Sequence, residues 1–164
     1  MERAGQAYRA GWASRFKVPH ILERIATTLL LDRLFLYVRI RRRHILVVED
    51  EPDTRELLDF TLRWHGHHVD TARNGREALE LLAEHSYDAI LSNLNMPEMD
   101  GEDLYRRIEH GWPHLAPRVV FVTAARPSTP FRAQYGGRPV PVLTKPYTPE
   151  RLLQVIDDVV ARDV

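Results

Sequence analysis

The sequence predicts an α/β domain: a doubly wound, five-stranded parallel sheet with helices on both faces. Three observations support this prediction. Four short segments are almost wholly apolar, as strands buried on both faces must be, and a more polar fifth segment, residues 67–72, fits the same alternation. Segments with apolar residues at helical spacing lie between them, and the connecting loops are short. Such alternation gives right-handed crossovers and therefore a parallel sheet. The expected strands are residues 44–48, 67–72, 89–93, 119–123 and 140–144.

The first half of the pattern has clear helix boundaries. Pro52 suits the first turn of the helix after the first strand, because its missing N–H is not needed there. Gly66 suits the end of that helix, whose inward face is expected to carry Leu57, Leu58, Thr61 and Leu62. Asn74 and Glu77 form a capping pair for the second helix, whose buried face is expected to be Ala78, Leu81 and Leu82.

The second half continues the alternation. Asp100 is expected to cap a third helix, which runs through Leu104 and Ile108. Residues 124–139 hold three prolines and a Gly-Gly pair, so any fourth helix there must be short. Thr148 and Pro149 open a last helix whose inward residues are Leu152, Val155, Ile156, Val159 and Val160. The expected strand order is 2-1-3-4-5, the flavodoxin-like arrangement.

Composition separates an N-terminal extension from this domain. The chain has 164 residues and no cysteine, which excludes disulfides and cysteine-based zinc sites. Residues 1–43 contain 10 Lys and Arg against 3 acidic residues, whereas residues 44–164 contain 13 against 20. We therefore treat residues 1–43 as a basic extension and residues 44–164 as the domain.

The extension is expected to be partly helical, because apolar residues are dense from 19 to 40. Asp32 and Arg33 interrupt this run before it reaches the length of a membrane span, and its charges are misplaced for a signal peptide. The basic cluster around Arg39 and Arg41–Arg43 suits membrane phosphate or nucleic acid. A wrongly assigned start codon, or a partner or dimer helix, would also explain the segment.

Polar residues gather where four predicted strands end. Glu49 and Asp50 follow the first strand, Asn93 ends the third, Thr123 ends the fourth, and Lys145 follows the fifth. The carboxyl ends of parallel strands meet at one edge of a sheet, where such folds place their sites. The residues should therefore converge.

The segment around Asn93, Leu-Ser-Asn-Leu-Asn-Met-Pro-Glu-Met-Asp-Gly, resembles the central motif of response-regulator receiver domains. With the paired acids and the later Lys-Pro, the resemblance covers residues 44–164. It implies that Glu49, Asp50 and the backbone carbonyl of Asn95 bind Mg²⁺. It also implies that Thr123 and Lys145 bind a phosphoryl group delivered by a histidine kinase.

Asn93 departs from the family, which has a phosphoacceptor aspartate at this position. A carboxamide is a poor nucleophile, so no acyl phosphate is expected to form. Its carbonyl oxygen could still accept a hydrogen bond from Lys145. With one carboxylate fewer, Mg²⁺ should bind weakly or not at all. Val142 stands where the family often has an aromatic switch residue, so that switch is absent as well.

Other polar residues offer weaker candidate sites. His65, His67 and His68 suggest a metal, but strand side chains alternate in direction, which favours a structural role. Asp88 and Asp100 are alternative phosphoacceptors, although neither is predicted to face Lys145. No phosphate-binding loop follows the first strand, which argues against a flavin protein.

The leading hypothesis is a cytoplasmic, bacterial, non-enzymatic receiver that acts in two-component phosphorelay signalling by binding a kinase or another protein. This pseudo-receiver would lack phosphorylation, a DNA-binding output domain and a transmembrane span, and it could form a homodimer. One alternative is an ordinary receiver switch that carries an Asp-to-Asn change at position 93. Another is a protein that acts through its basic extension, with the receiver as a scaffold.

Overall fold

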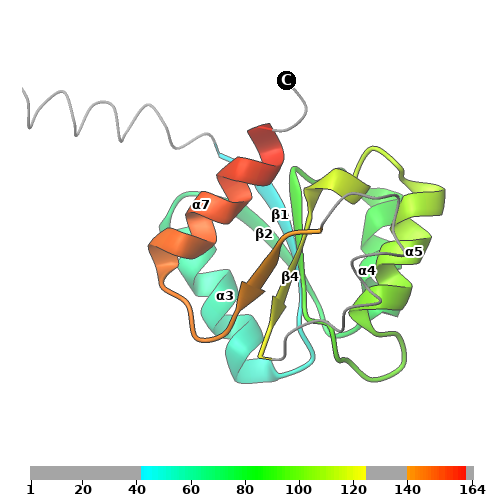
Figure 1. Cartoon of the computed structure of the whole chain (residues 1–164), viewed down its shortest axis with the longest axis horizontal. Coiled ribbons are helices and arrows are strands. Elements are labelled where there is room, and N and C mark those ends of the chain that lie inside the picture. The colour runs from blue at the N-terminus through cyan, green and yellow to red at the C-terminus, as the bar shows by residue number, and fades with distance from the viewer. Residues whose placement is uncertain (1–41, 125–139, 162–164) are drawn as a thin grey trace, which may run out of the picture. The chain divides into compact units, whose positions relative to one another are not determined.

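The computed structural model describes residues 42–124 and 140–161, and it contains the predicted parallel sheet. Its strand order is β2-β1-β3-β4-β5, and every adjacent pair is parallel, which confirms the predicted topology (Figure 1). The strands are β1 (His44–Val48), β2 (His68–Ala72), β3 (Ala89–Ser92), β4 (Val119–Thr123) and β5 (Val142–Thr144).

Helices cover both faces of the sheet, as the sequence predicts. Helices α3 (Pro52–Trp64) and α7 (Pro149–Val160) lie on one face, and α4 (Gly75–Glu84) and α5 (Gly101–Gly111) lie on the other (Figure 1). A short 3₁₀ helix, η1 (Ala116–Arg118), precedes β4. The domain therefore has three layers, with the sheet in the middle.

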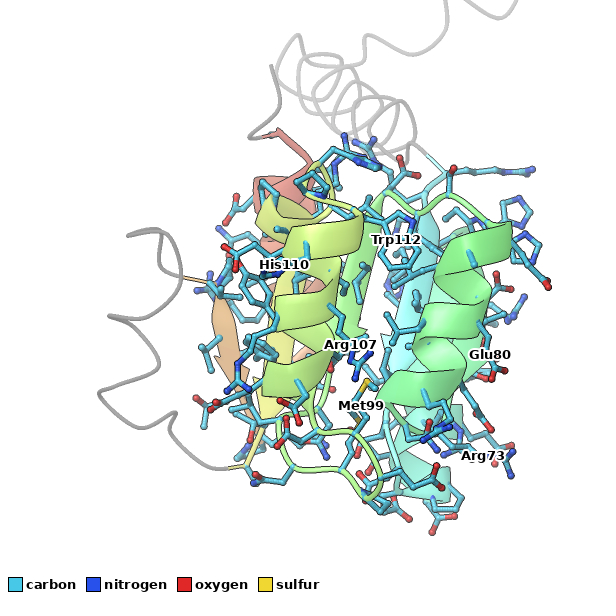
Figure 2. All side chains as sticks on the ribbon, turned by 90° about the vertical axis from the view of Figure 1, so that its right-hand side faces the viewer. Arg73, Glu80, Met99, Arg107, His110 and Trp112 are labelled. Atoms are coloured by element: carbon cyan, nitrogen blue, oxygen red, sulfur yellow. The ribbon has the colours of Figure 1, made fainter. Side chains whose placement is uncertain are left out.

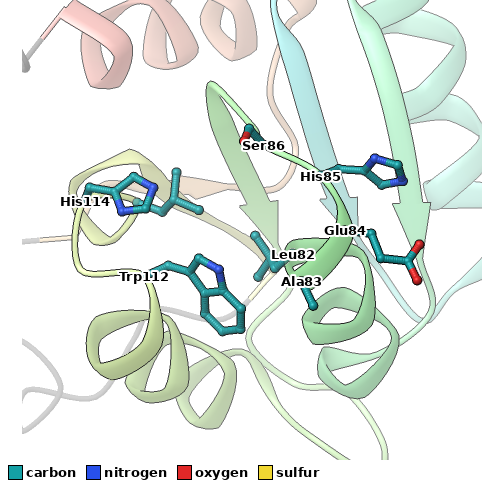
Figure 3. A pocket seen from close by; sticks show the side chains of 8 residues that line it. Leu82, Ala83, Glu84, His85, Ser86, Trp112 and His114 are labelled. Atoms are coloured by element: carbon teal, nitrogen blue, oxygen red, sulfur yellow. The ribbon is translucent and has the colours of Figure 1, made fainter.

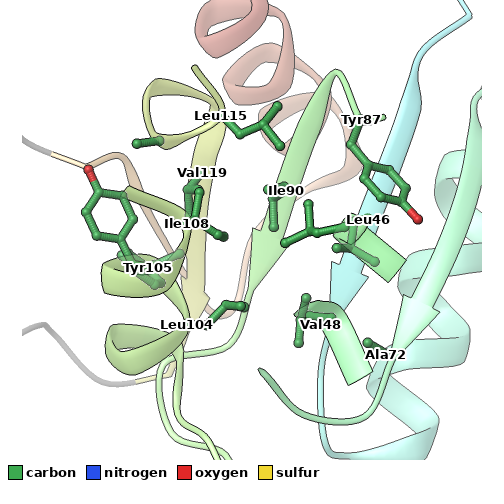
Figure 4. Close-up of a cluster of buried hydrophobic side chains, with 14 of the residues drawn as sticks. Leu46, Val48, Ala72, Tyr87, Ile90, Leu104, Tyr105, Ile108, Leu115 and Val119 are labelled. Carbon is green, nitrogen blue, oxygen red and sulfur yellow. The ribbon is translucent and has the colours of Figure 1, made fainter. Parts of the chain in front are cut away.

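The sheet is apolar on both faces because successive strand residues point to opposite sides. Leu46, Val48, Ile90 and Phe121 pack with residues of α4 and α5 (Figure 4). Their neighbours Ile45, Val47, Leu91 and Val120 pack with residues of α3 and α7. Each such side chain, once fully buried, contributes about 1.5–3 kcal/mol. This double core is what holds the strand ends in fixed positions.

Two partly buried side chains lie along the seam between α4 and α5 (Figure 2). Met99 and Trp112 are partly buried against the core and lie at opposite ends of the seam between these helices (Figure 2). A Cβ atom at Gly75 would lie 2.6 Å from the Met99 side chain. A larger residue at position 75 would clash with Met99, so glycine allows the Met99 side chain to pack here.

The predicted helix caps are confirmed. Asn74, Asp100 and Thr148 each accept a hydrogen bond from a main-chain N–H in the first turn of α4, α5 and α7. Gly66 follows α3 with a φ of 87°, a left-handed conformation that suits glycine. One cap was not predicted: the Glu51 carboxylate accepts hydrogen bonds from the main-chain N–H groups of Asp53 and Thr54.

The predicted inward face of α3 is wrong at one residue. Leu58 and Leu62 are buried, but Leu57 is 65% exposed. Neighbouring residues on a helix differ by about 100°, so Leu57 and Leu58 cannot both face the sheet. The fifth strand also begins at Val142 rather than at residue 140, because Pro141 has no N–H for the ladder.

The helix predicted within 19–40 lies outside the described residues, and so does the segment 124–139 predicted to hold a short helix, apart from Ala124. In the described parts of the chain, no helix is long and apolar enough to cross a membrane.

Candidate functional site

The ends of four strands bring the predicted site residues to one edge of the sheet. The pairing of Val48 with Ser92, and of Thr123 with Thr144, sets the strands in register. The ladder continues one residue further, because the Asn93 N–H donates to the Val48 carbonyl at 2.8 Å. The Lys145 N–H donates in the same way to the Thr123 carbonyl at 2.8 Å. The residues after the strands are thus fixed by the sheet itself.

The Asn93 side chain lies at the centre of this edge. Its amide nitrogen, Nδ2, donates to Glu49 Oε1 at 3.1 Å and to Asp50 Oδ1 at 3.0 Å. It also lies 3.1 Å from the main-chain carbonyl oxygen of Asn95. Three oxygen atoms therefore converge on one nitrogen that carries two hydrogens. Hydrogen bonds to charged acceptors are the stronger ones, at about 1.5–3 kcal/mol each.

Lys145 completes the cluster from the far side of Glu49. Its ammonium donates to Glu49 Oε2 at 2.8 Å, and Glu49 is only 1% exposed. The expected hydrogen bond from Lys145 to the Asn93 carbonyl oxygen is therefore replaced by an ion pair with Glu49. The physical reason is charge: a buried carboxylate attracts an ammonium more strongly than a neutral amide does.

The remaining predicted residues have different surroundings. Thr123 is 1% exposed at the end of β4, and Val142 is partly buried on β5 against the α4 and α5 core. The Asn95 side chain is exposed, so only its main-chain carbonyl takes part in the cluster. Asp50 is half-buried beside Asn93.

Sequence reasoning missed two residues that shape the site. The Arg55 guanidinium donates to the main-chain carbonyls of Glu49 and Asp50, at 2.7 and 3.2 Å, and so ties α3 to the end of β1. A basic residue one turn into the helix after an acid pair is the signal that could have indicated it. Tyr147 lies near Glu49, and burial, followed by the charge of Glu49, raises the pKa of its hydroxyl to about 12.

Gly101 allows the loop after Asn93 to return close to the strand. Its N–H donates to the Leu94 carbonyl at 2.8 Å. A Cβ atom at Gly101 would lie 2.2 Å from the main-chain oxygen of Asn93, a distance that no side chain tolerates. The glycine of the motif is thus needed for the backbone around Asn93.

The oxygen donors fit a hard divalent cation in chemical type. Two carboxylates and a main-chain carbonyl are the kind of ligands that Mg²⁺ takes. However, one oxygen of Glu49 already holds Lys145, and the third acidic position is an amide. In the described ranges 42–124 and 140–161, no group of three His, Cys, Asp or Glu side chains is placed to hold a metal.

The alternative candidates are engaged elsewhere. Asp88 accepts the His44 N–H at 2.8 Å where β1 begins, and Asp100 caps α5. Both carboxylates therefore have structural partners away from Lys145. Nδ1 of His67 accepts the Arg43 main-chain N–H at 3.3 Å, and burial lowers the pKa of this imidazole.

A second polar cluster lies where the strands begin. Asp70 accepts hydrogen bonds from the Tyr87 hydroxyl at 2.7 Å and pairs with His44 Nε2 at 2.8 Å. Burial of Asp70 opposes its ionisation, but these hydrogen bonds and the nearby imidazoles outweigh it and lower its pKa. Burial and the Asp70 carboxylate raise the pKa of Tyr87.

A cavity of about 270 Å³ is also remote from the predicted site. It lies near the C-terminal ends of α4 and α5, beside the segments that lead into β3 and β4 (Figure 3). None of the predicted site residues lines it. Its walls are Leu82, Ala83, Glu84, His85, Ser86, Trp112, His114 and Leu115.

Comparison with curated proteins shows similar chains. Transcriptional regulatory protein GlrR of Escherichia coli is 34% identical over 115 residues, which are 70% of this chain and 26% of GlrR. This chain thus spans about a quarter of that relative. Response regulator receiver protein CpdR of Brucella abortus is 33% identical over 115 residues, which are 70% of this chain and 94% of CpdR.

Solved structures of similar fold also include response regulators and chemotaxis proteins. The chemotaxis protein CheY4 of Vibrio cholerae has a TM-score of 0.64 and 28% identity, over 72% of this chain and 98% of that chain. The response regulator TrrA of Thermotoga maritima, solved in complex with Mg²⁺ and BeF, has a TM-score of 0.61 and 27% identity, over 71% and 98%. The model of the response regulator receiver domain matches residues 45–157. This chain therefore belongs to the response regulator receiver family of two-component signalling.

Proposed function

We propose that this receiver acts in two-component signalling by binding a partner protein, without accepting a phosphoryl group. One observation carries the proposal: the Asn93 amide nitrogen lies within 3.1 Å of Glu49, Asp50 and the Asn95 carbonyl. An amide that donates to both acids cannot act as the nucleophile. The partner would be a histidine kinase or another signalling protein.

The amide and Lys145 together satisfy the acids without a metal. Glu49 receives a hydrogen bond on each oxygen, one from Asn93 at 3.1 Å and one from Lys145 at 2.8 Å. Asp50 receives the other hydrogen of the amide at 3.0 Å. Two acids balanced by one ammonium and two hydrogen bonds repel each other less than three acids would. The pocket is thereby suited to a single, unmodified state.

Magnesium binding should be weak. Glu49, Asp50 and the Asn95 carbonyl would hold the ion, which in phosphoryl transfer neutralises developing charge. The Asn93 amide nitrogen now lies within 3.1 Å of an oxygen of each of these three groups, and Lys145 binds the second oxygen of Glu49. An incoming ion would have to displace these donors and would gain one carboxylate fewer than in an ordinary receiver.

The test is incubation with acetyl phosphate in the presence of Mg²⁺, followed by intact-protein mass spectrometry to detect an added phosphoryl group. The parent chain should gain nothing, and the matched variant Asn93→Asp should gain one acid-labile phosphoryl group. Peptide mapping must show that Asn93 has not deamidated. A phosphoryl group on the unaltered parent would disprove the proposal.

A second function is an ordinary phosphorylated switch in which only residue 93 has changed. It is favoured by the other positions, because Glu49, Asp50, Thr123 and Lys145 are all retained. The codon at position 93 in the genome separates the two: an aspartate codon would support the switch.

The basic extension is proposed to be separate from the receiver. Residues 44–164 should unfold cooperatively at nearly the same urea midpoint as the full chain. A large loss of stability on deletion of residues 1–43 would show that the extension belongs to the core.

A further inference from the structure

Helix α3 carries a stripe of large apolar side chains on its outer face. Leu57, Phe60 and Trp64 are 65%, 62% and 76% exposed, although Leu58 and Leu62 of the same helix are buried. Their spacing of three and four residues places them in one line along the helix. The rings of Phe60 and Trp64 stack, with centroids 6.0 Å apart and planes at 27°. A contiguous apolar patch of this kind typically marks an interaction surface.

The stripe continues into a groove on one side. This groove has a volume of about 320 Å³ and lies between α3 and the segment that joins β5 to α7. Leu57 belongs to both the stripe and the groove. Tyr147, Pro149 and Leu152 form the opposite wall, and Lys145 of the candidate site also lines it. The apolar surface is therefore wider than the three side chains alone.

The charges beside the stripe are arranged for a second copy of the chain. Glu56 and Arg63 lie seven residues apart, which places them on the same side of α3, near its opposite ends. Arg63 is half exposed; its Nε is held by Asp59 at 2.7 Å, and its guanidinium also donates to the main-chain carbonyl of Val69. Glu56 thus places a negative charge beside the first half of the stripe, and Arg63 places a guanidinium, partly neutralised by Asp59, beside the last turn.

An antiparallel pair of α3 helices makes these features complementary. The pairs Leu57–Trp64 and Glu56–Arg63 both have their midpoints next to Phe60. A two-fold axis at Phe60 would therefore bring Glu56 near the partner's Arg63, and Leu57 near the partner's Trp64. A two-fold interface requires this reciprocity, in which each residue of a pair meets the other on the second copy. A single heterologous helix would need no such symmetry.

We propose that this chain forms a homodimer through antiparallel contact of two α3 helices. In this dimer the partner's Trp64 covers Leu57 at the mouth of the groove, and Glu56 pairs with the partner's Arg63. The inference is independent of whether Asn93 prevents phosphorylation.

The first experiment is sedimentation velocity of the full chain from low to high micromolar concentration. We expect a concentration-dependent dimer. Trp64→Glu should weaken self-association roughly 30-fold or more, as loss of a central aromatic anchor does. Phe60→Ser should act in the same direction. The matched control Arg107→Glu, an exposed change on α5, should leave association unchanged. Thermal melts check that each variant is folded.

The second experiment tests the pairing itself by charge exchange. Glu56→Lys alone and Arg63→Glu alone should each associate more weakly than the parent. An equimolar mixture of the two variants should associate more strongly than either, because each lysine at 56 then meets a glutamate at 63. The double variant in one chain should recover association for the same reason.

Several results would overturn the proposal. They are a full chain that stays monomeric at all concentrations, a dimer that survives Trp64→Glu, and a mixture no stronger than its single variants. A monomer that binds an amphipathic helix of another protein through Trp64 would assign the surface to that protein instead.

Discussion

The replacement Asn93→Asp changes the charge of the site without changing its shape. In the parent, the amide nitrogen donates to Glu49 at 3.1 Å and to Asp50 at 3.0 Å. An ionised aspartate at position 93 would place a third negative oxygen at these distances. Without metal, the variant loses two hydrogen bonds to charged acceptors and gains repulsion from both acids. The variant should therefore be less stable than the parent when metal is absent.

The size of this loss can be bounded. Two hydrogen bonds to charged acceptors are together worth about 3–6 kcal/mol. The new carboxyl can instead take up a proton, and at pH 7 that costs about 4 kcal/mol for an ordinary aspartate. Lys145, which is only 25% exposed, offsets part of the repulsion. We expect a loss of about 2–4 kcal/mol and a fall in melting temperature of about 5–15 °C.

The pH dependence of the loss has a definite sign. Repulsion raises the pKa of the new carboxyl in the folded state, so the folded state binds its proton more tightly than the unfolded chain does. The deficit is therefore largest above the folded-state pKa. It shrinks as the pH falls towards the unfolded-state value of about 3.9.

The assay is urea and thermal unfolding of parent and variant, with and without Mg²⁺. Mg²⁺ should stabilise the variant, because an ion that binds the folded state raises the free energy of unfolding. The same concentration of Mg²⁺ should stabilise the parent much less. The matched control is Asn95→Asp, which makes the same chemical change two residues away on an exposed side chain. It keeps the main-chain carbonyl and should alter stability by less than about 0.5 kcal/mol.

Two results would refute this reasoning. If the metal-free variant is as stable as the parent, the Asn93 hydrogen bonds do not hold the acids together. If Mg²⁺ stabilises the variant no more than the parent, then Glu49 and Asp50 are not metal ligands.

Three further predictions concern other residues. Lys145→Met should destabilise the fold by about 2–4 kcal/mol in urea melts, because buried Glu49 loses its ammonium; an unchanged midpoint would contradict this. Gly101→Ala should lower the free energy of unfolding by more than about 2 kcal/mol, because its Cβ would clash with the main-chain oxygen of Asn93. Gly111→Ala is the matched control: its Cβ would meet no atom within 4 Å, so stability should stay the same or rise. Burial lowers the pKa of His67 from 6.5, so its contribution to stability is present above pH 6.5 and lost as the pH falls. In urea melts between pH 7.5 and 5.5, the free energy of unfolding of His67→Gln should therefore change less with pH than that of the parent.

Most of the sheet was predictable because parallel strands buried on both faces are short and apolar throughout, whereas the edge strand β2 is more polar and followed from its place in the alternation. Ile45, Val47 and Leu91 face one core while Leu46 and Val48 face the other, so no polar alternation is left. The convergence of the site residues followed from the same rule, because the strand ends share one edge. Topology alone was enough to bring Glu49, Asp50, Asn93 and Lys145 together.

Side-chain partners were less predictable than positions. Whether Lys145 bonds to Asn93 or to Glu49 depends on the positions of neighbouring polar atoms, which no sequence period encodes. Leu57 shows a different limit. The spacing of apolar residues on α3 fits two adjacent faces, and only the packed structure shows which face the sheet covers. Glu51 and Arg55 form hydrogen bonds to main-chain groups, and these bonds also depend on local geometry that the sequence pattern does not specify.

The site and the α3 surface have a physical connection that bears on how an unphosphorylated receiver could be regulated. A two-state protein shifts only when something binds one state better than the other. If Asn93 prevents phosphorylation, that bias must come from a different surface. Lys145 bonds to Glu49 in the site and also lines the groove beside Leu57. A partner seated in that groove would contact Lys145, whose ammonium neutralises the buried acid. Binding at α3 therefore has a direct route to the charge balance of the site.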